Sequence, residues 1–392
     1  MIEGREENGK LIITLTGKID SSNAPEIESE LRALREEHPC ESIELDCGQL
    51  EYSTSAGLRV ILRLKQEVDD TVLTNVQPEL YSIFDMTGFT EMMEVHKAYR
   101  VISVEGCEVI GRGANGKVYR IDPDTIVKVY LDADALPEIQ RARELSRMTF
   151  VAGIPTAIPY DVVRIESGGY GAVFELLNAT GFDRLIIEGK KTVDEVAEMS
   201  IRLLKLIQSK EIRSEILPDM KDVALNWAGF LKDYLPEELS AKLIELIRAV
   251  PEDDHLVHGD YHLKNVMLQN GESLLIDMDT LSHGHPIFDL ASIYNAYVGF
   301  SLADPQVTMS FLGLPREICL AFWRKSLELY LDTAEDSRLQ EVEDKAKIIG
   351  LTRVMRREIR RNGLNREDGR KLIEACRTAL TELIPQVDTL LF

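Results

Sequence analysis

The sequence lacks the features that mark membrane, secreted and nucleic-acid-binding proteins. No apolar run approaches the length of a membrane span, and the acidic N-terminus has no signal-peptide pattern. The five cysteines are odd in number and show no metal-ligand spacing, which favours a reduced, cytoplasmic setting. Basic residues are also scarce, since 45 Lys and Arg against 67 Asp and Glu leave a net charge of −22. This charge argues against a nucleic acid or an anionic membrane as partner. A cationic substrate fits it, and so does simple solubility.

The length and composition indicate several globular domains. A chain of 392 residues can form two or three domains, each with its own core. Apolar residues make up 44% and charged residues 29%, as in ordinary globular proteins. We predict an α/β domain at residues 1–98, a small β-rich lobe at 99–177 and a large helical lobe at 178–392, with a catalytic loop at 256–280.

The catalytic loop carries the clearest chemical signal. It reads L-V-H-G-D-Y-H-L-K-N-V-M-L-Q-N-G-E-S-L-L-I-D-M-D-T. Phosphoryl transfer from ATP needs a carboxylate to orient the attacking hydroxyl, and oxygen ligands to hold Mg²⁺ on the phosphates. Asp260 suits the first task, and Asn265 and Asp277 suit the second. The order H-x-D-x-x-x-x-N, followed by an Asp on the next strand, resembles the catalytic loop of protein kinases.

A glycine-rich turn precedes this loop in the sequence. Gly111, Gly113 and Gly116 form G-x-G-x-x-G-x-V, which lets backbone N–H groups approach phosphates. A dinucleotide-binding loop is the rival interpretation, but such a loop leads from a strand into a helix. Here the chain continues as a strand, turns, and enters I-V-K-V-Y with Lys128 at its centre. This order predicts that Lys128 pairs with the α- and β-phosphates; a lysine on an edge strand is the alternative.

Two further predictions complete the nucleotide site. A helix is expected from 137 to 150, and Glu144, 16 residues after Lys128, is the candidate acid that holds the lysine. Glu138 is the reserve candidate. The segment that begins at Glu175 follows a predicted hairpin, and we expect Glu175 and Leu177 to contact the adenine through their backbone groups.

Together these residues resemble the kinase fold, and more narrowly its aminoglycoside phosphotransferase and choline kinase branch. H-G-D-x-x-x-x-N with I-D-x-D replaces the protein-kinase H-R-D and D-F-G, and H-P-I-F-D-L-A at 285–291 resembles the D-L-A segment of that branch. The resemblance covers about residues 105–330. It implies an α+β bilobal fold, ATP and Mg²⁺ as cofactors, and a small-molecule hydroxyl acceptor of an aminoglycoside-like or aminoalcohol-like class. We expect Asp289 to tether the catalytic loop and His258 to brace it.

Residues 1–98 alternate strands with helices and resemble a different family. The motifs are L-x-G-x-I-D at 15–20, I-E-L-D at 43–46, Y-S-T-S-A-G-L-R-V-I-L at 52–62 and S-I-F-D-M-T-G-F at 82–89. They look like a STAS domain, the α/β fold of bacterial anti-sigma-factor antagonists. The resemblance implies that a protein partner binds this domain.

The same resemblance places a regulatory phosphoserine at Ser55. Thr54 and Ala56 depart from the Asp-Ser-Ser-Gly loop of that family. A phosphate on Ser55 would lie at a helix N-terminus, where free N–H groups favour an anion; otherwise Ser55 only caps the helix. The alternative function is therefore a signalling switch in which the kinase-like domain phosphorylates or senses Ser55.

Two features remain outside this interpretation. Five of the seven histidines lie near the catalytic loop and suggest a transition-metal hydrolase, although that rival leaves the glycine turn and Lys128 unexplained. Five arginines share one face of a helix expected at 340–362; they are Arg353, Arg356, Arg357, Arg360 and Arg361. This arginine face could bind a phosphorylated or acidic partner, including the acidic N-terminal domain. A solvated face paired with local acids such as Glu358 is the alternative.

Overall fold

The computed structural model describes residues 2–7, 9–113, 116–212 and 214–392. The chain divides into two compact units, Met1–Glu105 with Val162–Tyr170, and Gly106–Asp161 with Gly171–Phe392. Within the described ranges, no helix combines the length and the apolar character that crossing a lipid bilayer requires.

The first unit is built on a five-stranded sheet with the order β1-β2-β3-β4-β5. Its first pair is antiparallel and the other three pairs are parallel. The strands are β1 (Ile2–Glu7), β2 (Lys10–Ile19), β3 (Ser42–Ser53), β4 (Asp70–Val76) and β5 (Val95–Lys97). Parallel neighbours need helical crossovers, and the sequence supplies them between the strands.

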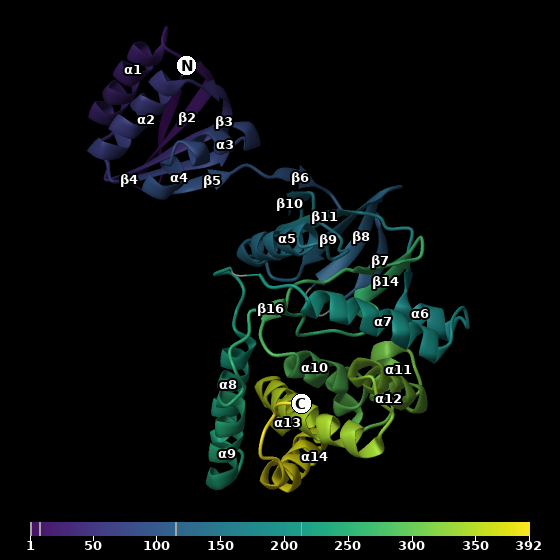
Figure 1. Cartoon of the computed structure of the whole chain (residues 1–392). Coiled ribbons are helices and arrows are strands. Elements are labelled where there is room, and N and C mark those ends of the chain that lie inside the picture. The colour runs from purple at the N-terminus through teal and green to yellow at the C-terminus, as the bar shows by residue number, and fades with distance from the viewer. Residues whose placement is uncertain (1, 8, 114–115, 213) are drawn as a thin grey trace. The chain divides into compact units, whose positions relative to one another are not determined.

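The helices of this unit pack their apolar residues against the sheet (Figure 1). They are α1 (Ala24–Glu37), α2 (Ser55–Glu67), α3 (Pro78–Met86) and α4 (Phe89–Met92). The α/β class of this part is as expected. The strand β1 was missed because its residues are mostly exposed and do not alternate between apolar and polar types.

In the second unit, four neighbouring strands follow the order β11-β9-β8-β7 and pair antiparallel. Their bounds are β7 (Glu108–Arg112), β8 (Gly116–Asp122), β9 (Thr125–Tyr130) and β11 (Tyr170–Glu175). The helix α5 (Leu136–Val151) follows β9 in the sequence. The predicted hairpin around residues 161–176 corresponds to β10 (Asp161–Ile165) and β11. The short β6 (Arg100–Ile102), which belongs to the first unit, pairs in parallel with β10.

The rest of the second unit is mainly helical. Its helices are α6 (Phe182–Ile187), α7 (Val193–Gln208), α8 (Met220–Phe230), α9 (Glu237–Arg248), α10 (Ile287–Tyr297), α11 (Val307–Leu312), α12 (Arg316–Leu331), α13 (Asp336–Arg360) and α14 (Glu367–Leu383). Every residue of α10 is buried, and α12 and α13 pack against it (Figure 1). The helices α6 and α11 have only six residues each, which is too short to show a helical period in the sequence.

Short strands frame the catalytic loop. They are β12 (Thr180–Gly181), β13 (Leu256–Val257), β14 (Val266–Gln269), β15 (Glu272–Leu275) and β16 (Ser282–His283). The strand β13 pairs with β16, and β14 pairs with both β12 and β15. Both ends of the loop are therefore held by backbone hydrogen bonds, which fixes the polar residues between them.

Candidate active site

A tight hairpin brings Asn265 and Asp277 to the same end of two paired strands. In the register of β14 and β15, Val266 lies opposite Leu275, and the Ile276 N–H donates to the Asn265 carbonyl at 3.1 Å. The turn residues Asn270 and Gly271 both have positive φ, as in the favoured two-residue hairpin turns. The hairpin thus places the two predicted metal ligands beside each other.

The carboxylate of Asp289 tethers the catalytic loop, as expected from the sequence. Asp289 is fully buried and accepts hydrogen bonds from the Gly259 N–H at 2.9 Å and from the His258 N–H at 3.2 Å. The Gln208 amide also donates to it, at 3.0 Å. Gly259 has φ +76, and a Cβ there would lie 2.8 Å from the Thr280 carbonyl oxygen. Only glycine can therefore make this turn.

The buried ring of His258 braces the loop, again as expected. Its Nδ1 accepts the N–H of Asp260 at 3.3 Å, and burial lowers the pKa of the ring. The neutral ring carries its proton on Nε2, an atom with no hydrogen-bond partner in the described part of the chain. His258 acts on the site by shaping the backbone of Asp260.

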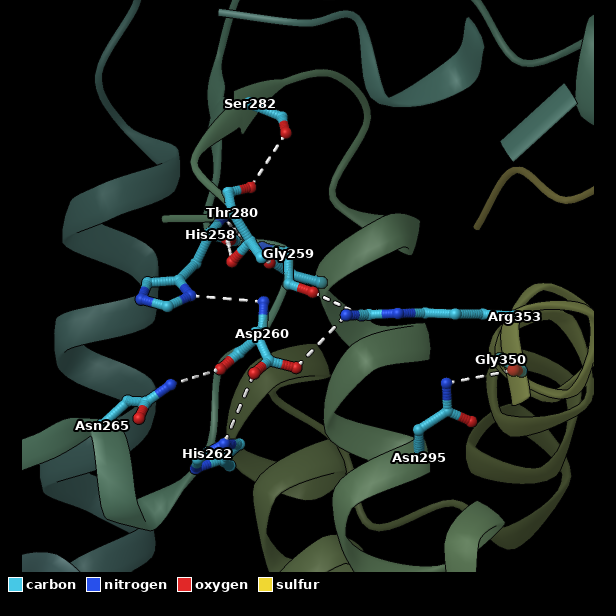
Figure 2. A network of polar contacts seen from close by, with 11 residues as sticks. His258, Gly259, Asp260, His262, Asn265, Thr280, Ser282, Asn295, Gly350 and Arg353 are labelled. Atoms are coloured by element: carbon cyan, nitrogen blue, oxygen red, sulfur yellow. Dashed lines mark hydrogen bonds and ion pairs between the residues drawn. The ribbon is translucent and has the colours of Figure 1, made fainter. Parts of the chain in front are cut away.

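Asp260 lies between the side chains of Arg353 and His262 (Figure 2). The Arg353 Nη2 lies 3.3 Å from its Oδ1, and the His262 Nε2 lies 3.6 Å from its Oδ2. Burial alone would raise the pKa of Asp260, but the hydrogen bond to His262 and the charge of Arg353 hold it well below its usual range. Asp260 is therefore ionised at neutral pH and can accept a hydrogen bond from a substrate hydroxyl.

Arg353 reaches Asp260 because α13 packs closely against α10. The Asn295 amide of α10 donates to the Gly350 carbonyl of α13 at 3.0 Å (Figure 2). A Cβ on Gly350 would lie 2.6 Å from the Asn295 Oδ1, so the helices can approach this closely only at a glycine. Arg353 follows one turn later and also donates to the Gly259 carbonyl.

The structure also places Lys128 at this site. Lys128 is central in β9, and its Nζ lies 3.2 Å from the Asp279 Oδ2. Burial alone would lower the pKa of Lys128, but the nearby carboxylates of Asp277 and Asp279 raise it above its ordinary value. The same burial, with the charge of Asp277, raises the pKa of Asp279. One lysine thus faces two carboxylates that follow the hairpin.

The prediction that Glu144 holds Lys128 is not met by this geometry. The Glu144 carboxylate is half exposed and lies 3.9 Å from Arg147 on the outer side of α5. The reserve candidate, Glu138, is nearer the site, because its charge contributes to the raised pKa of Asp279. From α5, it is Arg141 that bonds to the catalytic loop, donating to the Asp279 carbonyl at 3.1 Å. Periodicity could not single out Arg141, since its partner is a backbone atom far away in the sequence.

The glycine turn joins β7 to β8, and β9 lies between β8 and β11 in the sheet. The Gly113 N–H donates to the Gly116 carbonyl at 2.9 Å; residues 114 and 115 of the motif lie outside the described residues. A Cβ on Gly116 would lie 2.3 Å from the Val129 carbonyl oxygen, so this position requires glycine. At Gly111 a Cβ would make ordinary contacts, and at Gly113 it would meet nothing.

The predicted adenine-contacting segment follows β11. Glu175 ends this strand opposite Thr125, and the Leu176 N–H donates to the Asp124 carbonyl at 2.8 Å. Leu177 comes directly after, before β12 begins. Nothing in the described contacts tests whether Glu175 and Leu177 bind a base, and this stays a prediction.

The donor set near Asp260 fits Mg²⁺ chemically. The Asn265 amide nitrogen donates to the Asp260 carbonyl at 3.0 Å, which leaves its oxygen free to act as a ligand. Of the Asp277 carboxylate, Oδ1 accepts the Asp279 N–H at 3.1 Å. Mg²⁺ takes oxygen ligands, and in nucleotide sites one or two protein carboxylates with phosphates and water suffice. Among the described residues, no group of three or more His, Cys, Asp or Glu side chains is arranged to hold a metal.

In the first unit, Ser55 is the first residue of α2 and is exposed. The helix cap is the neighbouring Thr54, whose side chain accepts the Ala56 N–H at 3.3 Å. Of the two roles considered for Ser55, capping is therefore wrong. Its hydroxyl is left accessible at a helix N-terminus.

Comparison with known proteins assigns both parts of the chain. The model of the phosphotransferase enzyme family matches residues 106–312, and that of the STAS domain matches residues 1–101. A protein of Bordetella bronchiseptica named as an anti-sigma factor antagonist is 36% identical over 92 residues, which are 22% of this chain and 78% of that protein. The anti-sigma F factor antagonist of Paenibacillus polymyxa is 26% identical over 99 residues, 24% of this chain and 85% of that protein.

Solved structures similar to the chain include two kinds of small-molecule kinase. An ADP-bound aminoglycoside phosphotransferase is 16% identical, with 77% of this chain and 97% of that chain covered and a TM-score of 0.47. A choline/ethanolamine kinase family protein from Mesorhizobium loti is 12% identical, with coverages of 71% and 87% and a TM-score of 0.47. No substrate is carried over from similarities at this level.

Proposed function

Since this chain belongs to the phosphotransferase enzyme family and carries a STAS domain, we propose that it moves the γ-phosphate of ATP to a hydroxyl of a small molecule. The observation that carries the proposal is the meeting of Lys128, Asp260 and Asp277 around one catalytic loop. Lys128 comes from a distant part of the sequence, and the reaction needs it together with the two carboxylates of the loop. Aminoglycosides and aminoalcohols are the acceptor class that the sequence suggests.

Each side chain has a role in this proposal. Asp260 takes the proton of the acceptor hydroxyl, whose oxygen forms the new bond to phosphorus as the bond to the β-phosphate oxygen breaks. Lys128 binds phosphate oxygens, and in doing so exchanges its contact with Asp279 for them. Asn265 and Asp277 would hold Mg²⁺, which would supply positive charge next to the phosphates. Arg353 positions the carboxylate of Asp260, and Asp289 positions the loop that carries Asp260.

The test is nucleotide binding and transfer in one set of variants. The full chain with Mg-ATP should bind nucleotide and form ADP when a suitable alcohol is added. Asp260→Asn should bind nucleotide as before and lose transfer, because the amide cannot take the proton. The matched control is the same change, Asp304→Asn, at an exposed loop residue whose carboxylate accepts the Gln306 N–H. Tight transition-metal binding without nucleotide affinity would refute the proposal.

A second candidate function follows from the exposed hydroxyl of Ser55. In this proposal the phosphotransferase domain phosphorylates or senses Ser55, and the protein is a signalling switch. Incubation with labelled ATP and no added acceptor separates the candidates. Label that disappears in Ser55→Ala but persists in Ser22→Ala, another exposed serine near a helix start, supports the switch. No label, with turnover of an added alcohol, supports the small-molecule kinase.

A further inference from the structure

Three cationic side chains lie in or near the catalytic loop and are here called the cationic cluster: Arg353, Arg357 and Lys264. Arg353 bonds to the Asp260 carboxylate. Arg357 lies one turn further along α13, close enough for the charge of Asp260 to act on its guanidinium. Lys264 belongs to the catalytic loop itself, immediately before Asn265. The cluster thus joins part of the arginine face to the reaction centre.

Two phenylalanine rings hold the outer members of the cluster. The Arg357 Cζ lies 4.8 Å from the Phe300 ring centroid, and the Lys264 Nζ lies 5.7 Å from the Phe311 centroid. The two rings are 6.2 Å apart and nearly perpendicular, and the Phe311 ring also meets His262 at 5.1 Å. Cations are attracted to aromatic faces at these distances. The two rings therefore form a continuous contact between Arg357 and Lys264.

The outer members of the cluster, Arg357 and Lys264, pack on aromatic rings. In the part of the chain that the structure describes, neither Arg357 nor Lys264 forms an ion pair, and both are exposed. Glu358, which the sequence offered as a partner of the arginine face, bonds instead to Arg366. In a chain with a net charge of −22, cations left unpaired beside the catalytic carboxylate need an explanation.

We propose that the cationic cluster binds an anionic group of the acceptor, a phosphate or a carboxylate, and so presents a nearby hydroxyl of the same molecule to Asp260. The inference rests on the proposed phosphotransfer and replaces the acceptor class that the sequence suggested with an anionic one. An arginine fork matches the paired oxygens of either anion, and a lysine adds a point charge. The whole-chain charge fits a cationic acceptor or simple solubility, whereas the charge nearest to the Asp260 carboxylate is the positive guanidinium of Arg353. Local charge decides binding, because salt screens charges beyond about 10 Å.

Binding of inorganic phosphate to the full chain tests the cluster without any turnover. Calorimetry should show phosphate binding that weakens roughly tenfold or more in Arg357→Ala and in Lys264→Ala, since each loses a charged donor. Arg357→Lys, which keeps the charge but loses the fork, should fall between. Arg338→Ala is the matched control, because Arg338 lies on the same helix and pairs only with Glu341. Thermal unfolding of each variant shows that it is folded.

The acceptor class is tested with four small alcohols: glycerol, glycerate, glycerol 3-phosphate and ethanolamine. We expect ADP formation with an anionic member, with a KM that rises in Arg357→Ala while KM for ATP stays the same. Phosphate that does not bind, or that binds equally to Arg357→Ala and Arg338→Ala, overturns the inference. So does turnover of ethanolamine in preference to both anions. Nucleotide binding is measured separately. A lack of nucleotide binding would refute the proposed phosphotransfer, whereas the phosphate result alone decides whether the cationic cluster binds an anion.

Discussion

Lys128 and Asp279 form an ion pair across 151 residues of sequence, with 3.2 Å between the Nζ and the Oδ2. Lysine in this place was expected to pair with an acid of α5. Instead the acid comes from the segment that follows the hairpin, which also carries the candidate metal ligand Asp277. Nucleotide phosphates entering the site must therefore compete with Asp279 for the lysine, and this makes the strength of that pair a determinant of nucleotide affinity.

Replacing Lys128 tests this relationship. In Lys128→Met, the Kd for nucleotide should rise roughly tenfold or more, because a charge-assisted contact to phosphate is lost. Asp279→Asn should do the opposite and lower the Kd, since it frees the lysine. Lys371→Ala, on α14 and paired with Glu367, is the control and should bind nucleotide like the parent. Equal affinities for all four proteins by calorimetry would contradict the assignment of Lys128.

Arg353 should set the acid limit of activity. The ionised form of Asp260 is the active one, so activity is present above its pKa and is lost as pH falls through it. Arg353 is one of the groups that lower this pKa. In Arg353→Ala the pKa should rise, and the acid limb of kcat/KM should move to higher pH. Arg353→Lys should restore part of the shift. An acid limb at the same pH in all three proteins would show that Arg353 does not tune Asp260.

Asp289 should contribute to stability as well as to activity. Asp289→Ala leaves the N–H groups of His258 and Gly259 and the Gln208 amide without their acceptor in a buried place. Each unsatisfied donor costs about 1–3 kcal/mol, so we expect the free energy of unfolding of this unit to fall by about 3 kcal/mol or more. Asp289→Asn keeps one acceptor oxygen and should lose less. Thermal unfolding and hydrogen exchange of the catalytic loop are the measurements.

Gly350→Ala tests the packing that delivers Arg353. The added Cβ would lie 2.6 Å from the Asn295 Oδ1 and 3.0 Å from the Ala291 carbonyl oxygen, so α13 must move away from α10. We expect a loss of about 1–3 kcal/mol in stability and the same acid-limb shift as in Arg353→Ala. Gly229→Ala, where a Cβ meets nothing in α8, should be neutral or stabilising by up to about 1 kcal/mol. A stable Gly350→Ala enzyme with an unchanged pH profile would rule out this role.

Local chemistry in the sequence predicted much of the site, because its signals lie close together along the chain. The tether by Asp289 and the brace by His258 were expected, and the hydrogen bonds confirm both. The order of classes, α/β and then α+β, was also correct. The helix expected at 137–150 is α5, which differs by one residue at each end, whereas the helix expected at 340–362 is α13, which begins earlier, at Asp336, and ends at Arg360.

The remaining features depend on tertiary packing, which periodicity cannot supply. The arginine spacing in α13 was visible, but whether that face meets solvent or Asp260 depends on how α13 crosses α10. The acid facing Lys128 was sought on α5 by analogy, and the structure pairs the lysine with Asp279. The edge strand β1 has little apolar pattern because its partner β2 supplies the buried residues of the pair.

The two-residue turn at Asn270 and Gly271 links the two candidate Mg²⁺ ligands, Asn265 and Asp277, in one rigid hairpin. Backbone hydrogen bonds join β14 to β15, so a displacement of β14 moves Asn265 and Asp277 together. The distance between these two residues therefore stays the same when the loop shifts. An inserted residue in the turn would slip the pairing by one place and turn neighbouring side chains to the opposite face. Variation in length is thus far better tolerated in the connections outside this hairpin than within it.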